Sequence, residues 1–251
     1  MLAEIVRSFR PNLFDGRTVV VSGGSSGIGQ AIARGFAALG ANTLATGSSE
    51  KKLAASRTDP TNAGLSFERL DVKDTAAVSA FFNRLQGLDV LVNTQGIARP
   101  GDEWSEKTFL EVMDVNLNSA MRLSIAARTK LAATKGSVIN LASMLSYLAD
   151  ADVPAYTASK TGITGLTRAL AHGLGPEGIR VNAIAPGYHR TDMTRALWEH
   201  PESEARIAAR SALKRWGTVD DLVGATLFLA SPAAEFITGI TLPVDGGYHT
   251  G

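Results

Sequence analysis

The sequence of 251 residues contains no cysteine, which excludes disulfide bonds, thiolate nucleophiles and metals bound by cysteine. It has no excess of charge of either sign, because 25 basic side chains are balanced by 24 acidic ones and no basic block occurs. A nucleic acid or a membrane surface is therefore not expected as a partner. The four histidines, at positions 172, 189, 200 and 249, lack the spacing of metal ligands, so no metal site is expected.

Long apolar runs are absent as well. No stretch reaches the length of a transmembrane helix, and residues 1–16 lack the apolar core and the cleavage pattern of a secretory signal. We therefore expect a cytoplasmic protein. The hydrophobic fraction of 45% is typical of a globular protein with enough apolar material for a core. No repeat, linker or low-complexity tract divides the chain, so we expect one domain over residues 1–251.

Short apolar runs alternate with helical patterns along the whole chain. This alternation predicts an α/β fold with a doubly wound parallel sheet of about seven strands and helices on both faces. The strands are expected at 18–21, 42–46, 65–70, 90–92, 137–141, 180–184 and 241–244, and the helices through 32–39, at 50–56, 75–85, 106–117, 121–133 and 154–173, near 195 and at 219–229.

A glycine-rich segment, Ser22-Gly23-Gly24-Ser25-Ser26-Gly27-Ile28-Gly29, connects the first predicted strand to the first long helix. Backbone amides at a helix N-terminus can bind a pyrophosphate, and glycines allow the tight turn and the close approach of the ligand. The spacing G-x-x-x-G-x-G differs from the commonest dinucleotide fingerprint, and a flexible turn is the alternative. The position between a strand and a helix favours a phosphate-binding loop.

Tyr156 and Lys160 lie four residues apart on a predicted helix, so their side chains project from the same face. An isolated tyrosine has a pKa of about 10, and a cation within about 4–6 Å lowers it by about 1–3 units. Such a phenol can exchange protons with a substrate oxygen. An exposed helix that carries an aromatic residue and a lysine is the alternative. Ser143, just after a predicted strand and thirteen residues before Tyr156, favours a catalytic group.

Ligands bind to parallel α/β sheets beyond the carboxyl ends of the strands. Polar or glycine-rich segments follow the predicted strands at this edge, and we expect them to form one site. These segments are 22–29, 47–49, 71–72, 93–96, Ser143 and 186–191.

With these motifs in this order, the chain resembles the short-chain dehydrogenase/reductase family from about Asp15 to Gly247. The resemblance implies a Rossmann-like fold, hydride transfer between a nicotinamide cofactor and a small-molecule ketone or secondary alcohol, and a homotetramer. It makes residues 1–251 a single dinucleotide-binding and catalytic domain, with a substrate-loop region near 188–212. The matching elements are 22–29, Asp71-Val72, Asn93 with Gly96, Asn116, Ser143, Tyr156 with Lys160, Pro186-Gly187 with Thr191, and 245–247.

The resemblance also implies a role for each catalytic residue. Tyr156 would be the general acid in reduction and the base in oxidation, and Lys160 would lower its pKa and bind the nicotinamide ribose. Ser143 would orient the substrate oxygen. Asn116 would hold a water that links Lys160 to solvent, with a helix-bending core asparagine as the alternative, since asparagine is disfavoured within helices.

The same resemblance gives a set of cofactor contacts, with a departure after the fourth predicted strand. There Asn93-Thr94-Gln95-Gly96 replaces the usual Asn-Asn-Ala-Gly, so we expect altered cofactor packing without loss of binding. The expected contacts are Gly23, Ser25, Ser26, Gly27, Ile28, Gly29, Ser48, Asp71, Val72, Asn93, Gly96, Tyr156, Lys160, Pro186, Gly187 and Thr191.

The end of the second predicted strand bears on the choice of cofactor. Residues 46–49 contain no carboxylate for the ribose 2′-hydroxyl of NAD, and their hydroxyls can donate to a 2′-phosphate. We therefore expect NADP(H) in preference to NAD(H), with Lys51 or Lys52 near the phosphate. The arginine that commonly marks NADP binding in the family is absent from Ser25 and Ser48.

Two substrate classes are open. The segment 191–197 resembles 3-oxoacyl-carrier-protein reductases, whereas 214–217 resembles gluconate and polyol dehydrogenases. A non-catalytic NADP-binding sensor or interaction protein is the alternative from another class, but such a protein would not need the proton-transfer residues. The segments that line the family's substrate cleft contain Met144, Leu145, Tyr147, Tyr188, His189, Trp198, Arg99 and Trp104, and packing within the lid is the alternative for each of these side chains.

Overall fold

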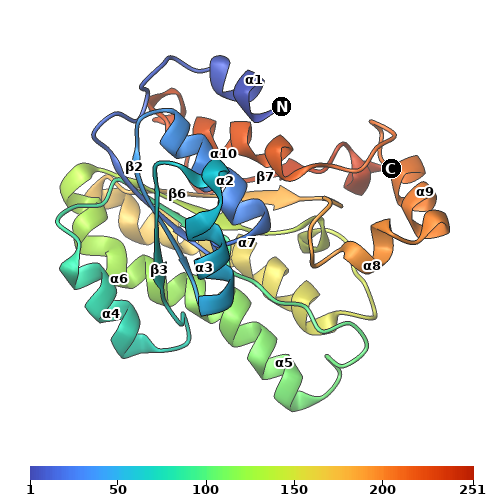
Figure 1. The fold of residues 1–251 in the computed structure, drawn as a ribbon. Coiled ribbons are helices and arrows are strands. Elements are labelled where there is room, and N and C mark those ends of the chain that lie inside the picture. The colour runs from blue at the N-terminus through green and yellow to red at the C-terminus, as the bar shows by residue number, and fades with distance from the viewer.

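The computed structural model describes residues 1–251, and its seven strands form one parallel sheet in the order β3-β2-β1-β4-β5-β6-β7 (Figure 1). The order reverses direction at β1, so the loops after β1 and β4 leave the sheet on opposite faces and leave a crevice between them. The predicted doubly wound parallel sheet is confirmed. The strands are β1 (Thr18–Ser22), β2 (Asn42–Gly47), β3 (Leu65–Arg69), β4 (Val90–Asn93), β5 (Ser137–Leu141), β6 (Arg180–Pro186) and β7 (Thr241–Val244).

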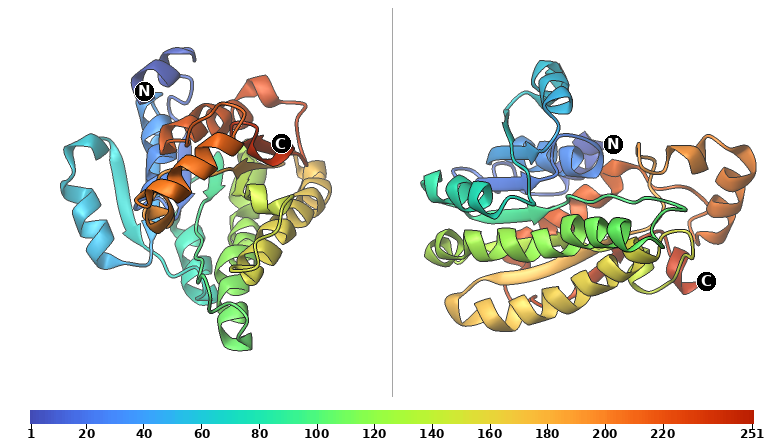
Figure 2. Two further views of the ribbon diagram at one scale, coloured as in Figure 1. Left: turned by 90° about the vertical axis from the view of Figure 1, so that its right-hand side faces the viewer. Right: turned by 90° about the horizontal axis from the view of Figure 1, so that it is seen from below.

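Helices cover both faces of the sheet. On one face lie α1 (Leu2–Arg7), α2 (Gly27–Ala38) and α10 (Val223–Ala230), and on the other lie α4 (Thr75–Arg84), α6 (Ser119–Thr134) and α7 (Pro154–Leu174). The remaining helices are α3 (Glu50–Thr58), α5 (Glu106–Met113), α8 (Arg195–Trp198) and α9 (Pro201–Arg210). Figure 2 shows α8 and α9 at one end of the sheet, near the C-terminus. None of these helices is both long enough and apolar enough to cross a membrane.

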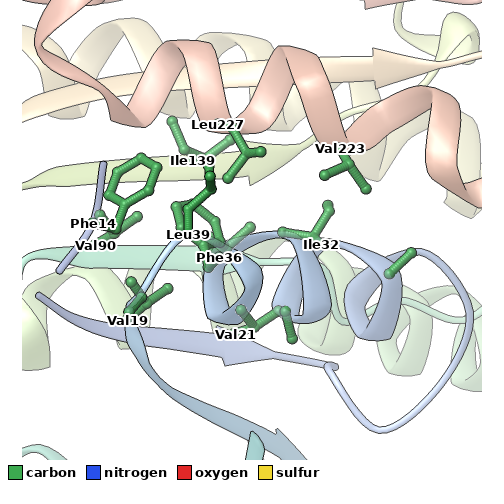
Figure 3. Packing of buried hydrophobic residues seen from close by; sticks show 14 of the residues in the cluster. Phe14, Val19, Val21, Ile32, Phe36, Leu39, Val90, Ile139, Val223 and Leu227 are labelled. Carbon is green, nitrogen blue, oxygen red and sulfur yellow. The ribbon is translucent and has the colours of Figure 1, made fainter. Parts of the chain in front are cut away.

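The central strand β1 is buried on both faces, as expected from its unbroken valine run. Val19 and Val21 pack towards α2 and α10, whereas Val20 packs towards α4 and α6. Figure 3 shows Ile32 and Phe36 of α2, and Leu39 directly after it, between the sheet and α10. Burial of each such side chain contributes about 1.5–3 kcal/mol. This packing fixes the start of α2, and therefore the glycine-rich loop, against the edge of the sheet.

Two helices were not expected from the sequence. Helix α1 has six residues and fully buries none of them, and α9 buries only Ile207, so both add little to the core. Helix α9 lies inside the substrate-loop region expected near 188–212. The two helices expected at 106–117 and 121–133 are joined without a break, because a π-helical turn at Asp114–Asn118 connects α5 to α6.

Candidate active site

The carboxyl ends of the strands open into a cleft of about 810 Å³. Its wall combines the glycine-rich loop, the segments that follow β2, β3, β4, β5 and β6, and two side chains from α7. All the expected cofactor residues line this cleft except Asn93, whose side chain is buried and donates to Asn140 Oδ1 at 2.9 Å. The neighbouring strand already uses the Asn93 side-chain amide, and the expected cofactor contact at Asn93 stays a prediction.

The glycine-rich loop forms a cradle that side chains would fill. A Cβ atom at Gly29 would overlap the Thr94 hydroxyl and the Gly23 carbonyl, and one at Gly23 would lie 2.6 Å from Gln95 N. Gly23 also has a φ of +78°, which favours glycine. The N-cap of α2, Ser26, makes no side-chain bond to the first turn, so the amides there are available to an anion.

The charge of the cleft also suits a phosphate-bearing ligand. Seven lysine or arginine side chains line it, against three carboxylates. Lys52 and Arg34 are two of the basic residues that line it. Arg34 was not anticipated, and its guanidinium donates to Asn62 Oδ1 at 2.7 Å and to Asp59 Oδ2 at 3.1 Å. A basic residue about two turns into the helix that follows a phosphate loop was the signal that could have revealed it.

Ser143, Tyr156 and Lys160 lie together on the cleft wall. Ser143 follows β5, and the other two come from successive turns of α7. The Lys160 ammonium lies 5.5 Å from the centre of the Tyr156 ring and donates to the carbonyl of Leu141 at 2.7 Å. The sequence-based placement of an amine beside a phenol is therefore confirmed.

The electrostatics of this pair differ from expectation. Burial raises the pKa of Tyr156 to about 12, and the charge of Glu103 adds to the rise, whereas a hydrogen bond from Ser143 opposes it. Burial lowers the pKa of Lys160 to about 8. The expectation that Lys160 lowers the pKa of the phenol is not met in this structure. Both groups have lost water, and the amine is held by a backbone carbonyl.

Asn116 lies in the π-helical turn and does not line the cleft. Its Oδ1 accepts from Ile97 N at 2.8 Å, and its Nδ2 donates to Ile97 O at 3.0 Å and to Ser159 Oγ at 3.0 Å. Asn116 thus ties the segment after β4 to α7. These contacts fit the alternative of a core asparagine at a helix irregularity. The expected role of Asn116 in holding a water beside Lys160 stays a prediction.

The two residues that depart from the family pattern bond to the protein. Thr94 Oγ1 donates to the carbonyl of Ser22 at 2.6 Å, which ties the end of β4 to the glycine-rich loop. Gln95 lines the cleft and donates to Ser119 Oγ at 2.8 Å, while its Oε1 has no protein partner. The substitutions therefore alter the wall of the cleft and leave the cradle intact.

Only three of the expected substrate-cleft residues, Arg99, His189 and Trp198, line the cleft. The other side chains have partners elsewhere, as the alternative of packing within the lid allows. Met144, Leu145 and Tyr188 pack in an apolar cluster with Trp216 and Tyr248, Tyr147 stacks on His249, and Trp104 is 75% exposed and donates to Ala151 O.

Comparisons with known proteins agree with this geometry. A family model described as enoyl-(acyl carrier protein) reductase matches residues 23–249. The chain is 37% identical to a 2-dehydro-3-deoxy-D-gluconate 5-dehydrogenase of Escherichia coli, over 93% of this chain and 96% of that protein. It is 35% identical to a 3-oxoacyl-acyl-carrier-protein reductase of Salmonella typhimurium, over 94% of this chain and 98% of that protein.

A solved structure gives the same picture. A gluconate 5-dehydrogenase from Burkholderia cenocepacia, in complex with NADP and tartrate, superimposes with a TM-score of 0.88 at 33% identity, over 94% of this chain and 96% of that one. At 33% identity the likeness indicates a shared family and not only a shared fold.

The cradle predicts the effect of one added methyl group. We expect Gly29→Ala to weaken binding of NADPH at least tenfold, because its Cβ displaces the Thr94 hydroxyl and the Gly23 carbonyl. Titration of NADPH fluorescence measures the affinity. Gly87→Ala is the matched control, since a Cβ there meets nothing within 4 Å. Wild-type affinity in the Gly29 variant would show that the loop does not need this close contact.

The lowered pKa of Lys160 predicts a pH dependence of stability. Its pKa is about 8 in the folded protein, against the ordinary lysine value of 10.5, so the folded protein binds fewer protons than the unfolded chain between these values and gains stability as the pH rises. Above about pH 10 the raised pKa of Tyr156 acts in the opposite direction. Relative to Lys160→Met, the wild-type protein should gain about 2 kcal/mol of unfolding free energy between about pH 7 and pH 10. Urea unfolding at several pH values measures this difference, and a flat difference would contradict the prediction.

Proposed function

Because the chain belongs to the short-chain dehydrogenase/reductase family, we propose that it is an NADP(H)-dependent dehydrogenase that interconverts a hydroxyl and a ketone on a sugar acid. The family assignment makes it an NAD(P)-dependent oxidoreductase. The observation that carries the finer proposal is the meeting of Ser143, Tyr156 and Lys160 in one cleft with the glycine-rich loop.

The residues of the cleft fit the cofactor. The loop from Gly23 to Gly29 would hold the pyrophosphate on its amides, and Lys160 would bind the nicotinamide ribose. When bound, the nicotinamide supplies the hydride acceptor in oxidation and the hydride donor in reduction. The chain then has to position the substrate oxygen and to move one proton.

Tyr156 is the group that moves this proton in our proposal. A phenol with a pKa of about 12 keeps its proton at neutral pH, so the site is prepared to donate it to a ketone oxygen in reduction. Ser143 orients that oxygen from the end of β5. In oxidation the phenol must first lose its proton, and its raised pKa makes this loss favourable only at alkaline pH.

NADP(H) is favoured by the residues near Ser48. No carboxylate follows β2 in that part of the cleft, whereas Lys52 and Arg34 offer positive charge to a 2′-phosphate. The Burkholderia relative was solved with NADP, which supports the same assignment.

A polar substrate is favoured by the side chains that follow β4 and β6. Arg99, His189 and Arg190 line the cleft there, and the two arginines can donate hydrogen bonds to a carboxylate of the substrate. The apolar side chains of Met144, Leu145 and Tyr188 are closed within their own cluster, so they provide no slot for an acyl chain. A 3-oxoacyl thioester, the substrate named for the Salmonella relative, is the second candidate because of that similarity.

We also infer a homotetramer, as the family resemblance implies. Leu110 of α5 and Met121 and Ile125 of α6 are between 45% and 58% exposed. Large apolar side chains of this kind on neighbouring helices are suited to an interface between copies of the chain.

A comparison of wild-type protein with Tyr156→Phe tests the proposed function. Wild-type protein should reduce NADP⁺ with sugar acids and should turn over neutral alcohols and 3-oxoacyl thioesters more slowly. The phenylalanine variant should lose at least about a hundredfold in kcat, because the proton donor is gone, while it still binds NADPH. Absorbance at the wavelength of the reduced cofactor follows turnover, and fluorescence follows binding. Equal turnover in the two proteins would remove Tyr156 from the mechanism. NADPH binding without any turnover by the wild-type protein would favour the alternative of a non-catalytic NADP-binding sensor or interaction protein.

The adjacent residues Lys51 and Lys52 provide a matched test of the cofactor preference, since both are exposed and only Lys52 lines the cleft. Lys52→Ala should lower kcat/KM for NADPH roughly tenfold through loss of a charge-assisted contact and leave kcat/KM for NADH unchanged. Lys51→Ala should change neither value. The proposal fails if the wild-type protein is more efficient with NADH, or if Lys52→Ala affects both cofactors equally.

A further inference from the structure

Glu103 is a carboxylate with no solvent exposure and no salt bridge, and the proposed chemistry does not use it. It lies in the segment between β4 and α5, here called the 97–105 segment. Its Oε1 accepts from the backbone amide of Arg99 at 2.8 Å, and its Oε2 accepts from the backbone amide of Tyr156 at 2.7 Å. A buried charge costs free energy unless it is hydrogen-bonded. These two hydrogen bonds therefore stabilise the buried carboxylate, and they connect it to Arg99 and Tyr156.

The contact with Tyr156 falls in the first turn of α7. The N-cap of this helix is Val153, which has no side chain that can accept a hydrogen bond, and Pro154 occupies the first position. The amide of Tyr156 is one of the donors that helices leave without an internal partner. Glu103 satisfies this donor from a distant part of the sequence, and its negative charge also suits the positive end of the helix dipole.

Two further hydrogen bonds join the same regions. Gly101 N donates to Asp152 O at 2.9 Å, and Trp104 Nε1 donates to Ala151 O at 3.0 Å. The 97–105 segment is therefore fastened along residues 151–156, directly before and within the first turn of α7. Glu103 is the only one of these links that reaches the residue proposed to transfer the proton.

We propose that Glu103 is a positioning residue that fixes Tyr156 and Arg99 relative to each other, and so sets the distance between the proton donor and the substrate-binding wall. This inference rests on the proposed function, in which Tyr156 donates the proton and Arg99 faces the substrate. One rigid, buried side chain bonded to both main chains holds this spacing without contact with the substrate.

Glu103 also acts on Tyr156 through its charge, which makes this role separable from a purely structural one. The charged or titratable groups that face the phenol are Glu103, Tyr188 and Lys160, and Ser143 is its hydrogen-bonding neighbour. Negative charge on Glu103 raises the pKa of Tyr156. Removal of that charge lowers the pKa, so oxidation should reach half of its maximal rate at a lower pH.

Three variants of the full-length protein test the inference. Glu103→Gln removes the charge and keeps the shape, but its NH₂ group cannot accept from one of the two amides. Glu103→Asp keeps the charge but is one methylene too short to bridge both amides. Glu106→Gln removes a charge from the exposed start of α5 nearby and serves as the control. The measurements are kcat and KM for oxidation as functions of pH, NADPH affinity by fluorescence, and the melting temperature.

Glu103→Gln should lower kcat for oxidation at least tenfold. It should also move the midpoint of the rise of this kcat with pH to a lower pH. Its NADPH affinity should stay within twofold of wild type. Glu103→Asp should lower kcat with an unchanged midpoint, and the control should match wild type throughout. If Glu103→Gln does not fold, a wild-type kcat in Glu103→Asp overturns the inference and a lowered kcat upholds it.

A lower melting temperature with an unchanged kcat and pH profile in the folded variants would leave Glu103 as a structural cap alone and overturn the inference. Failure of the inference is distinguishable from failure of the proposed function. If Tyr156→Phe abolishes turnover while the Glu103 variants behave as wild type, only the inference is lost. If Tyr156→Phe turns over normally, the proposed function is lost whatever the Glu103 variants do.

Discussion

The loss of water around Lys160 and Tyr156 is the constraint on which the site depends. A lysine that is only 2% exposed can be kept in a fold when its amine has a fixed acceptor, here the Leu141 carbonyl at the end of β5. That bond ties α7 to the strand that also carries Ser143 to the cleft. Burial therefore does two things at once, since it perturbs the pKa of both groups and fixes their positions relative to the sheet.

Much of the architecture was predictable from local pattern. The valine run of β1, the glycine-rich loop and the apolar face of α2 are each short-range signals, and parallel strands align their carboxyl ends at one edge. That rule alone brought residues as far apart as Gly23 and Thr191 into one cleft. Helices α1 and α9 escaped prediction; both are short and bury almost nothing.

The parts of the site that escaped prediction depend on tertiary contacts. The direction of the pKa shift of Tyr156 follows from how deeply α7 is covered, which no spacing of residues reports. Glu103 looks like an ordinary loop carboxylate until the amide that it accepts from is known to be that of Tyr156. Arg34 was visible as a charge on a helix, but only the packing of α2 beside β2 shows that it reaches the cleft.

The π-helical turn between α5 and α6 has a consequence for how the chain tolerates changes in length. Each residue advances an α-helix by about 100°, and a π-turn accommodates one residue more than the α-turn it replaces. Removal of one residue from 114–118 would restore an ordinary helix and swing the Asn116 amide away from Ile97 and Ser159. α5 and α6 would keep their relative orientation, because the π-turn completes about the same rotation as an α-turn with one residue more. The irregular turn thus adds one residue, and aims the Asn116 amide at Ile97 and Ser159, without changing the faces that the two helices bury.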